Sequence, residues 1–352
     1  MDLSRRHALA LSVVGVLSLL GGGALAGCSR AADAEGEPSA DPEQEPASPT
    51  QPAELKVFST FLFDTYIEIK AACDQALLDR LNERLIFFEN TFSRTREGSD
   101  IFTLNMAGGA PVEVHEETAA LISQSLVFSE LSGGLFDISI GAVSSLWDFK
   151  EGILPDATVL AEAVTHVDYR GIEVNGTTIT LADPAARLDL GGIAKGYAAD
   201  EMVRLLREGG CESALINLGG NVYALGLKPD GTPWSVGVQD PQQPRGTLKA
   251  VTAAHDLSVV TSGPYERGFE QDGVFYHHIL DPRTGYPVQT DLASATIFSD
   301  LSCEGDALTT CCFLMGQTAA LKLVRARPGV DALLVDLNGE VLMTDDTIAE
   351  LR

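Results

Sequence analysis

The chain has 352 residues, of which 45% are hydrophobic, and its 24 Lys and Arg against 50 Asp and Glu give a formal net charge of −26. This length allows one large or two smaller globular domains with a sizeable core. Such an acidic chain excludes nucleic acid and anionic lipid as main partners, because both require basic patches. A phosphate-bearing ligand would therefore need a helix N-terminus, a lysine or a bound cation to hold it.

The N-terminus is typical of a bacterial lipoprotein leader. Arg5-Arg6 precedes the uncharged, apolar segment 8–26, and Leu25-Ala26-Gly27-Cys28 resembles a lipobox. The sequence thus predicts a signal peptide over 1–27, and a lipid on Cys28 that anchors the chain to the extracytoplasmic face of a bacterial cell membrane. A transmembrane anchor is the alternative, because an apolar run of this length can just span a bilayer. The paired arginines match part of a twin-arginine signal, so Sec and twin-arginine export both stay open.

Residues 28–54 are predicted to be a disordered acidic tether. From residue 31 onward this stretch is rich in Pro, Ala, Ser, Glu and Asp and has no Lys or Arg. It cannot bury enough apolar surface to offset the entropy lost on folding. We therefore expect a single folded domain over 55–352.

The cysteines indicate no framework of disulfides. The chain has six of them, at positions 28, 73, 211, 303, 311 and 312. They form no CxxC motif and have no regular spacing, so a disulfide-rich fold or a zinc site is not expected. Buried free thiols are the default interpretation. One disulfide in an oxidising compartment is the alternative, but the sequence does not choose the pair.

In the predicted domain, strand and helix patterns follow one another without a regular βαβα repeat. Strand patterns cover 55–71, 167–174, 177–181, 187–190, 214–218, 222–227, 234–239, 248–254, 258–262, 274–280, 293–299, 331–336 and 340–344. Helical patterns cover 74–92, 99–106, 116–131, 155–164, 193–206, 303–314 and 319–326. Segment 135–138 is predicted as a buried strand or a turn. This mixture favours an α+β fold, with mixed or antiparallel sheets and packed helices, over a doubly wound α/β fold.

A glycine turn joins a predicted strand to a predicted helix in segment 187–200. Gly191-Gly192 precedes the helix, and free N–H groups at a helix start suit a phosphate. Asp189 and Lys195 flank the turn with opposite charges. The alternative is an ordinary strand-to-helix turn with a surface lysine.

Asp306 and Thr310 are four residues apart in the predicted helix 303–314. This spacing places both side chains on one helix face, where their oxygens can reach one ion. A carboxylate with a hydroxyl favours Mg²⁺ over zinc. The alternative is an acidic residue near a helix start and a polar residue on a solvated face.

His277-His278 ends an apolar strand beside the turn Asp281-Pro282-Arg283-Thr284-Gly285. A histidine in this place could act as a general base, although a structural histidine is the alternative. Arg267 could hold a phosphate or form an ion pair with Glu266 or Asp281.

Taken together, these segments resemble the ApbE family of FAD:protein FMN transferases. The matching segments are Phe136-Asp137-Ile138 with Gly141 and Leu146-Trp147, Leu188–Gly196, Ile216–Asn221, Ser262-Gly263 with Tyr265-Glu266-Arg267, His278–Gly285, and Asp306-Ala307-Leu308 with Thr309-Thr310. They stand in order and span nearly all of 55–345. The resemblance implies an α+β fold related to the T-fold and built in two parts.

The resemblance also implies a reaction. Family members bind FAD with Mg²⁺ across its pyrophosphate and transfer the FMN half to a threonine hydroxyl of a client flavoprotein, releasing AMP. By position, the metal ligands would be Asp306, Thr310 and the Gly192 carbonyl, and His278, at its ordinary pKa, would be the base. Residues contacting FAD would be Phe63, Leu135, Phe136, Asp137, Asp189, Lys195 and Leu280.

Two departures from the family pattern stand outside the expected metal and base positions. Phe63-Asp64-Thr65 replaces the Met-Gly-Thr that is frequent in the family, and Pro264 stands where a polar residue is usual.

Two other functions would use the same residues. One is Mg²⁺-dependent hydrolysis of FAD to FMN and AMP, and the other is a non-catalytic, lipid-anchored flavin- or solute-binding protein.

Overall fold

The computed structural model describes residues 54–345 and 347–352, which belong to one compact unit, Pro52–Arg352. The predicted signal peptide, Cys28 and the predicted tether up to residue 53 lie outside the described residues. Within the described part of the chain, no helix combines the length and hydrophobicity needed to cross a bilayer.

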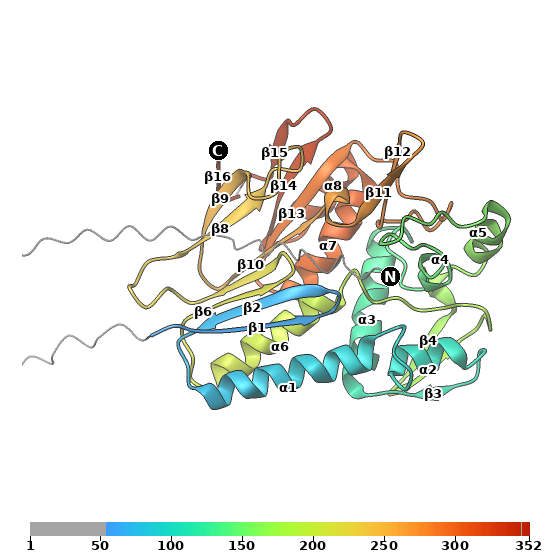
Figure 1. The fold of residues 1–352 in the computed structure, drawn as a ribbon, viewed down its shortest axis with the longest axis horizontal. Helices are drawn as coiled ribbons and strands as arrows, with labels where there is room; N and C mark the ends of the chain where they lie inside the picture. Colours follow the sequence, from blue (N-terminus) through green and yellow to red (C-terminus); the bar gives the residue numbers. More distant parts are fainter. Residues whose placement is uncertain (1–53, 346) are drawn as a thin grey trace, which may run out of the picture. The chain divides into compact units, whose positions relative to one another are not determined.

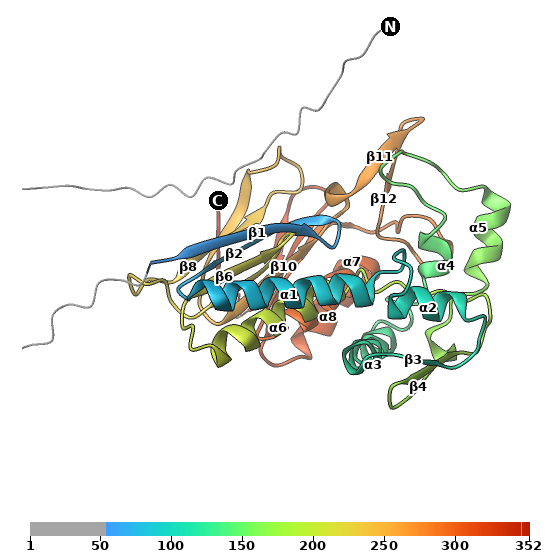
Figure 2. The same cartoon turned by 60° about the horizontal axis from the view of Figure 1, so that its bottom comes forward.

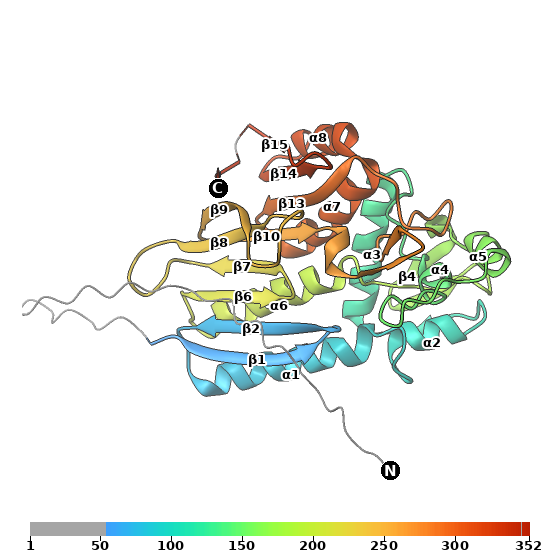
Figure 3. The same cartoon turned by 45° about the horizontal axis from the view of Figure 1, so that its top comes forward.

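An eight-stranded antiparallel sheet runs through the unit, and Figure 3 shows its strands one beside the next. In spatial order the strands are β1 (Lys56–Leu62), β2 (Thr65–Ala71), β6 (Ala214–Leu218), β7 (Asn221–Leu225), β10 (Leu257–Ser262), β13 (Leu292–Ser299), β14 (Val330–Asp336) and β15 (Val341–Met343). Strand β2 buries Ile67, Ile69 and Ala71 at alternate positions, as a strand covered on one face should. Strand β13 is buried at every position, because both faces of the sheet are covered there.

Four helices cover one face of this sheet (Figures 1 and 2). They are α1 (Gln75–Phe92), α6 (Ala194–Glu208), α7 (Ser302–Met315) and α8 (Gln317–Arg325). The other face packs on a three-stranded sheet through a second apolar cluster that includes Trp234, Val236 and Phe298. That sheet consists of β8 (Trp234–Gln239), β9 (Leu248–Ala254) and β16 (Ala349–Leu351).

The remaining elements lie on the right in Figure 1. They are α2 (Asp100–Met106), α3 (Glu116–Leu131), α4 (Gly141–Ser144), α5 (Ala157–Val164), the sheet of β3 (Val112–Glu113), β5 (Thr178–Leu181) and β4 (Ile172–Asn175), and the hairpin of β11 (Gly268–Gln271) and β12 (Val274–His277). Short 3-10 helices at Tyr169–Gly171 and Pro264–Glu266 complete the described chain. The α+β prediction is confirmed.

The prediction of a strand at 187–190 was wrong. Arg187 forms only an isolated parallel bridge with Ile140. Instead, the Asn105 side chain binds the backbone of Leu188. It accepts a hydrogen bond from the Leu188 N–H at 2.6 Å and donates one to the Leu188 carbonyl at 2.9 Å. At Leu188 a side-chain amide thus takes the place of a strand partner, whereas the Asp189 N–H donates to the Ile138 carbonyl at 2.8 Å. Segment 135–138 is a turn, in agreement with one of its two predicted states.

Asp200, on α6, binds the N-terminus of α7. Its carboxylate accepts hydrogen bonds from the N–H groups of Ser302 and Cys303, at 2.7 and 2.9 Å. Burial raises the pKa of Asp200 to about 6, so the group is ionised at neutral pH and accepts both bonds. The start of α7 is therefore held by α6, and this arrangement fixes how the two helices meet.

We expect Asp200→Ala to lower the free energy of unfolding by about 1–3 kcal/mol at pH 7.5, because two buried N–H groups lose their acceptor. Urea unfolding measures this change. Asp156→Ala is the matched control, because Asp156 also accepts from two N–H groups at a helix start, but on the exposed surface. Its expected cost is about 1 kcal/mol. An equal or larger loss in the control would contradict a special role of Asp200.

Candidate active site

Asp306 lies where α6 crosses α7, and its side chain is 4% exposed. Its Oδ2 accepts from the Gly196 N–H at 2.9 Å, and its Oδ1 lies 3.5 Å from Lys195 Nζ. A Cβ on Gly196 would lie 2.3 Å from the Ser302 carbonyl oxygen, so only glycine allows this close approach of the helices. The carboxylate is thus fixed by the backbone of α6, with Oδ1 directed to the lysine.

The glycine turn before α6 lies against the same face of α7. A Cβ built on Gly192 would lie 3.6 Å from Thr310 Oγ1 and 3.1 Å from the Phe136 ring. Lys195 Nζ also donates to the Gly191 carbonyl at 3.2 Å. The structure therefore brings the three predicted metal positions together from segments more than a hundred residues apart.

The donors at this place fit Mg²⁺. Across the described residues there is no cluster of three or more His, Cys, Asp or Glu side chains that could hold a metal. A cation here would therefore rely on one carboxylate, a hydroxyl and a backbone carbonyl. These are hard oxygen donors, and Mg²⁺ is commonly held by one or two carboxylates together with water and substrate phosphate.

Asp189 is held by three different segments. Its Oδ2 accepts from Ser144 Oγ at 2.7 Å and lies 3.1 Å from Arg94 Nε, while its Oδ1 accepts from the Gly191 N–H at 2.9 Å. Sequence reasoning missed Arg94 and Ser144. Neither has a local signal, because both are defined only by their contact with a distant aspartate.

The three residues of segment 135–137, predicted to contact the flavin, have different surroundings. The Phe136 ring is buried beside Gly192, and Leu135 is partly buried against the main core. The Asp137 carboxylate accepts from the Ser139 N–H at 2.8 Å and the Tyr169 N–H at 2.9 Å. Burial raises the pKa of Asp137. Its hydrogen bonds order the loop that carries Phe136.

Phe63 lies in the two-residue turn between β1 and β2. Phe63 and Asp64 have φ values of 54° and 56°, as a type I′ hairpin turn requires. Such values suit Gly, Asn or Asp and are uncommon for a bulky residue such as phenylalanine. Glu89, on α1, accepts a hydrogen bond from the Phe63 N–H at 2.8 Å. Leu280 lies in a small apolar cluster with Trp147 and Leu160. Direct contact of Phe63 and Leu280 with FAD stays a prediction.

His278 is partly buried at the end of β12. Its Nδ1 lies 3.1 Å from the Arg267 carbonyl oxygen, which can only accept, so Nδ1 carries the proton and Nε2 has the free lone pair. Burial, helped by the charges of Arg267 and Lys195, lowers the pKa of His278 from 6.5 to about 4. The expectation of an ordinary pKa was therefore wrong, because it neglected burial and the neighbouring cations. His278 is a neutral imidazole at pH 7.

His277 has a structural role. Its Nδ1 accepts from the Ile279 N–H at 3.3 Å, and its ring packs on Phe313 with centroids 5.9 Å apart.

The ion pairs suggested for Arg267 were wrong. Glu266 binds Arg245 at 2.9 Å and Asp281 binds Arg283 at 2.6 Å, so within the described residues Arg267 forms no salt bridge.

The lowered pKa of His278 predicts an acid limb of the pH–rate profile near pH 4. The neutral imidazole is the form that can accept a proton, and it is depleted only below its pKa of about 4. We therefore expect kcat/KM for a reaction that uses His278 to stay flat from pH 8 down to about pH 5. Kinetics with folded protein, checked by circular dichroism, measure this. A limb near pH 6.5 that disappears in His278→Gln would contradict it.

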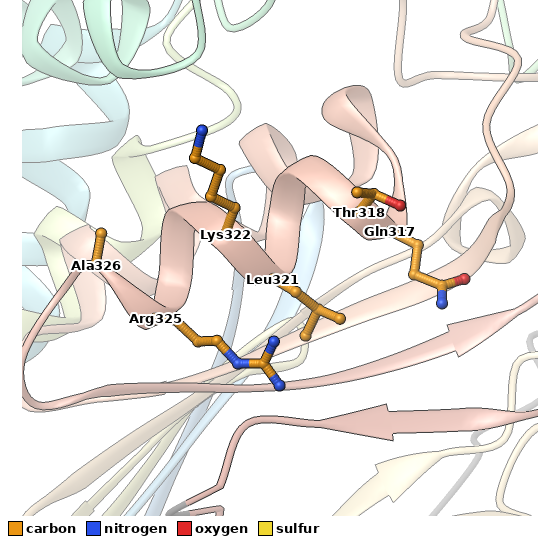
Figure 4. A pocket seen from close by; sticks show the side chains of 6 residues that line it. All are labelled: Gln317, Thr318, Leu321, Lys322, Arg325 and Ala326. Atoms are coloured by element: carbon orange, nitrogen blue, oxygen red, sulfur yellow. The ribbon is translucent and has the colours of Figure 1, made fainter.

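Two surface hollows lie away from the residues at the crossing of α6 and α7. One of about 510 Å³ follows the outer side of α8, with Leu321, Lys322 and Arg325 among its lining residues (Figure 4). Another of about 540 Å³ lies beside the β11–β12 hairpin, with Tyr276 and Tyr286 in its wall. Neither is lined by Asp306, Thr310 or Lys195.

Comparison with known proteins identifies relatives of the chain. The model of the ApbE family matches residues 63–334. The FAD:protein FMN transferase of Treponema pallidum is 41% identical over 301 residues, which cover 80% of this chain and 83% of the relative. One from Klebsiella pneumoniae is 36% identical over 276 residues, covering 77% and 85%.

A solved structure shows the same fold. The ApbE protein of Thermotoga maritima matches with a TM-score of 0.76 and 31% sequence identity, over 83% of this chain and 97% of that one. The family model covers well over half of the chain, and two relatives exceed 30% identity across most of it. The resemblance seen in the sequence motifs is thus confirmed, and the chain belongs to the ApbE family.

Proposed function

We propose that the protein transfers the FMN moiety of FAD to a threonine hydroxyl of a client flavoprotein and releases AMP. The observation that carries the proposal is the convergence of Asp306, Thr310, Gly192 and Lys195 at the crossing of α6 and α7. The transferase names of the relatives support it.

Asp306, Thr310 and the Gly192 carbonyl would hold Mg²⁺, which neutralises negative charge on a pyrophosphate when bound. Lys195 adds a second positive charge close to the same carboxylate. Its contact with the Gly191 carbonyl keeps the ammonium group over the turn. Charge neutralisation and positioning are the main requirements of phosphoryl transfer. The cation site and Lys195 would together supply both.

His278 would accept the proton of the acceptor hydroxyl at Nε2. As the threonine oxygen bonds to the phosphorus of the FMN half, the bond between that phosphorus and the bridging oxygen breaks, and AMP leaves with the oxygen. The hydrogen bond from Nδ1 to the Arg267 carbonyl fixes the ring so that Nε2 is available. Because the imidazole is already neutral at pH 7, no prior loss of a proton is needed.

We further propose that the protein is exported and held by lipid on Cys28 at the extracytoplasmic face of the membrane. The lipobox-like segment Leu25-Ala26-Gly27-Cys28 supports this. Clients would then be exported or membrane-bound flavoproteins. Partition of the protein into a detergent phase, and its loss in Cys28→Ala, would test the anchor.

The test of the transfer combines purified protein, FAD, Mg²⁺ and a flavoprotein with an FMN-attachment threonine from the same genome. We expect a fluorescent client band that survives denaturation, and one AMP per flavin transferred. A client with that threonine changed to alanine is the control. AMP and free FMN formed at full rate without any client would instead establish FAD hydrolysis. FAD binding with neither product would establish a binding protein.

A further inference from the structure

Cys73 and Cys211 lie beside each other at one end of the large sheet. Cys73 follows β2, and Cys211 comes shortly before β6. The two strands are antiparallel neighbours with Ala71 opposite Ala214, and the ladder continues with a 2.9 Å bond from the Ala72 N–H to the Ser213 carbonyl. Cys73 is the next residue on one strand and stands opposite Glu212, and Cys211 is one residue beyond Glu212. Neighbouring strands are about 5 Å apart, so the two cysteines are diagonal neighbours at the end of the ladder. Both side chains belong to the main apolar core, with Cys211 inside it and Cys73 packed against it.

The backbone at both positions is fixed by packing. The Cys211 N–H donates to the Leu206 carbonyl at 2.9 Å, and its thiol lies 3.4 Å from the Ser213 carbonyl oxygen. A Cβ on Gly209 would lie 2.5 Å from the Leu77 side chain, so the start of α1 packs closely on the end of α6. These contacts hold the two segments side by side, which is the arrangement that a disulfide requires.

We propose that Cys73 and Cys211 are joined by a disulfide in the mature protein. The S–S bond forms by thiol–disulfide exchange. The two thiols lose two protons and two electrons, and an external disulfide, on a protein oxidant or a small molecule, takes up both pairs and is reduced to two thiols. Cys73 is partly exposed and gives the oxidant access, whereas Cys211 is buried. The bridge depends on the export proposed above but not on flavin transfer.

The surroundings indicate a structural bridge rather than a redox switch. Burial raises the pKa of Cys73 to about 11 and also raises that of Cys211. Reactive switch cysteines have lowered pKa values, so neither thiol is suited to rapid reversible exchange. The bridge would join the start of α1 to the end of α6 and close a loop of roughly 140 residues, a length at which a cross-link restricts the unfolded chain strongly.

The other described cysteines have no such arrangement. Cys303 donates to Gln124 Oε1 at 3.1 Å, and Cys311 lies 3.9 Å from the Phe128 carbonyl oxygen. Both partners are on α3. Cys312 is adjacent to Cys311 on α7, and consecutive residues of a helix point in different directions. These three thiols provide an internal reference for a test.

The test traps thiols in cells that express the full-length chain with its own leader. N-ethylmaleimide is added before lysis and during denaturation, and peptides are analysed by mass spectrometry with and without reductant. We expect Cys303, Cys311 and Cys312 to be alkylated, and the peptides of Cys73 and Cys211 to appear linked until they are reduced. Alkylation of Cys73 and Cys211 to the same extent as the reference thiols, without reductant, would overturn the proposal.

Variants provide an independent readout. Cys73→Ser should make Cys211 reactive without reductant, and Cys211→Ser should do the same for Cys73. Reductant should lower the Tm of the wild-type protein by about 5–10 °C. It should leave the Tm of the double variant unchanged, whereas Cys303→Ser should respond like the wild type. A wild-type Tm that is insensitive to reductant would count against a stabilising bridge.

Discussion

Asp306→Asn is expected to lower kcat/KM for flavin transfer by about a thousandfold or more. The amide has almost the volume of the carboxylate, and its oxygen can still accept from the Gly196 N–H. The change removes the negative charge, however, and places an NH₂ donor where Oδ1 would face a cation. Fluorescent labelling of the client at increasing Mg²⁺ concentrations measures the loss. We expect higher Mg²⁺ to restore little of it.

Glu304→Gln is the matched control for Asp306→Asn. Glu304 lies on the same helix, in an ion pair with Arg327. Its loss should change the rate by less than about twofold, because partly exposed ion pairs contribute little. Both variants should unfold within a few degrees of the wild type. Full activity of Asp306→Asn, with normal unfolding, would refute the assignment of a cation to this site.

His278→Gln is expected to reduce kcat by about 100- to 10,000-fold, the usual contribution of a general base. The glutamine side chain can still form a hydrogen bond but cannot accept the proton of the hydroxyl. FAD binding should remain within a few-fold of the wild type, because the ring acts on the acceptor and not on the cofactor. Single-turnover labelling of the client, together with fluorescence titration of FAD, separates the two effects.

The adjacent histidine is the control for this experiment. His277 accepts from the Ile279 N–H inside the fold, so His277→Gln should lower the Tm and leave the rate per folded molecule nearly unchanged. The pair of neighbouring variants thus separates chemistry from stability. A low transfer rate in His277→Gln together with a normal rate in His278→Gln would show that His277, and not His278, is the base.

Local patterns predicted most elements of the fold. The helix expected at 116–131 is α3 at the same bounds, and the helix expected at 99–106 is α2, which Ser99 caps. Segment 187–190 was wrongly predicted as a strand, because the backbone of Leu188 pairs with the side chain of Asn105, which no local window contains. The short strands β3 and β16 carry too few residues for an alternating pattern.

The residues of the candidate site that could be predicted are those that belong to the family motifs. Those motifs named Asp306, Thr310 and Gly192, which the structure brings together. Arg94 was not predictable, because it acquires a role only when the chain folds it against Asp189. The pKa of His278 depends in the same way on burial, which a strand pattern does not report.

The contact of Gly196 with the backbone of Ser302 has a consequence for how this site can evolve. Main chain meets main chain there, so the spacing between the glycine turn and Thr310 is set by peptide dimensions and not by the size of any side chain. Residues around the crossing can therefore diverge without altering that spacing. Gly196 itself should tolerate no replacement, because even alanine would force the two halves of the site apart.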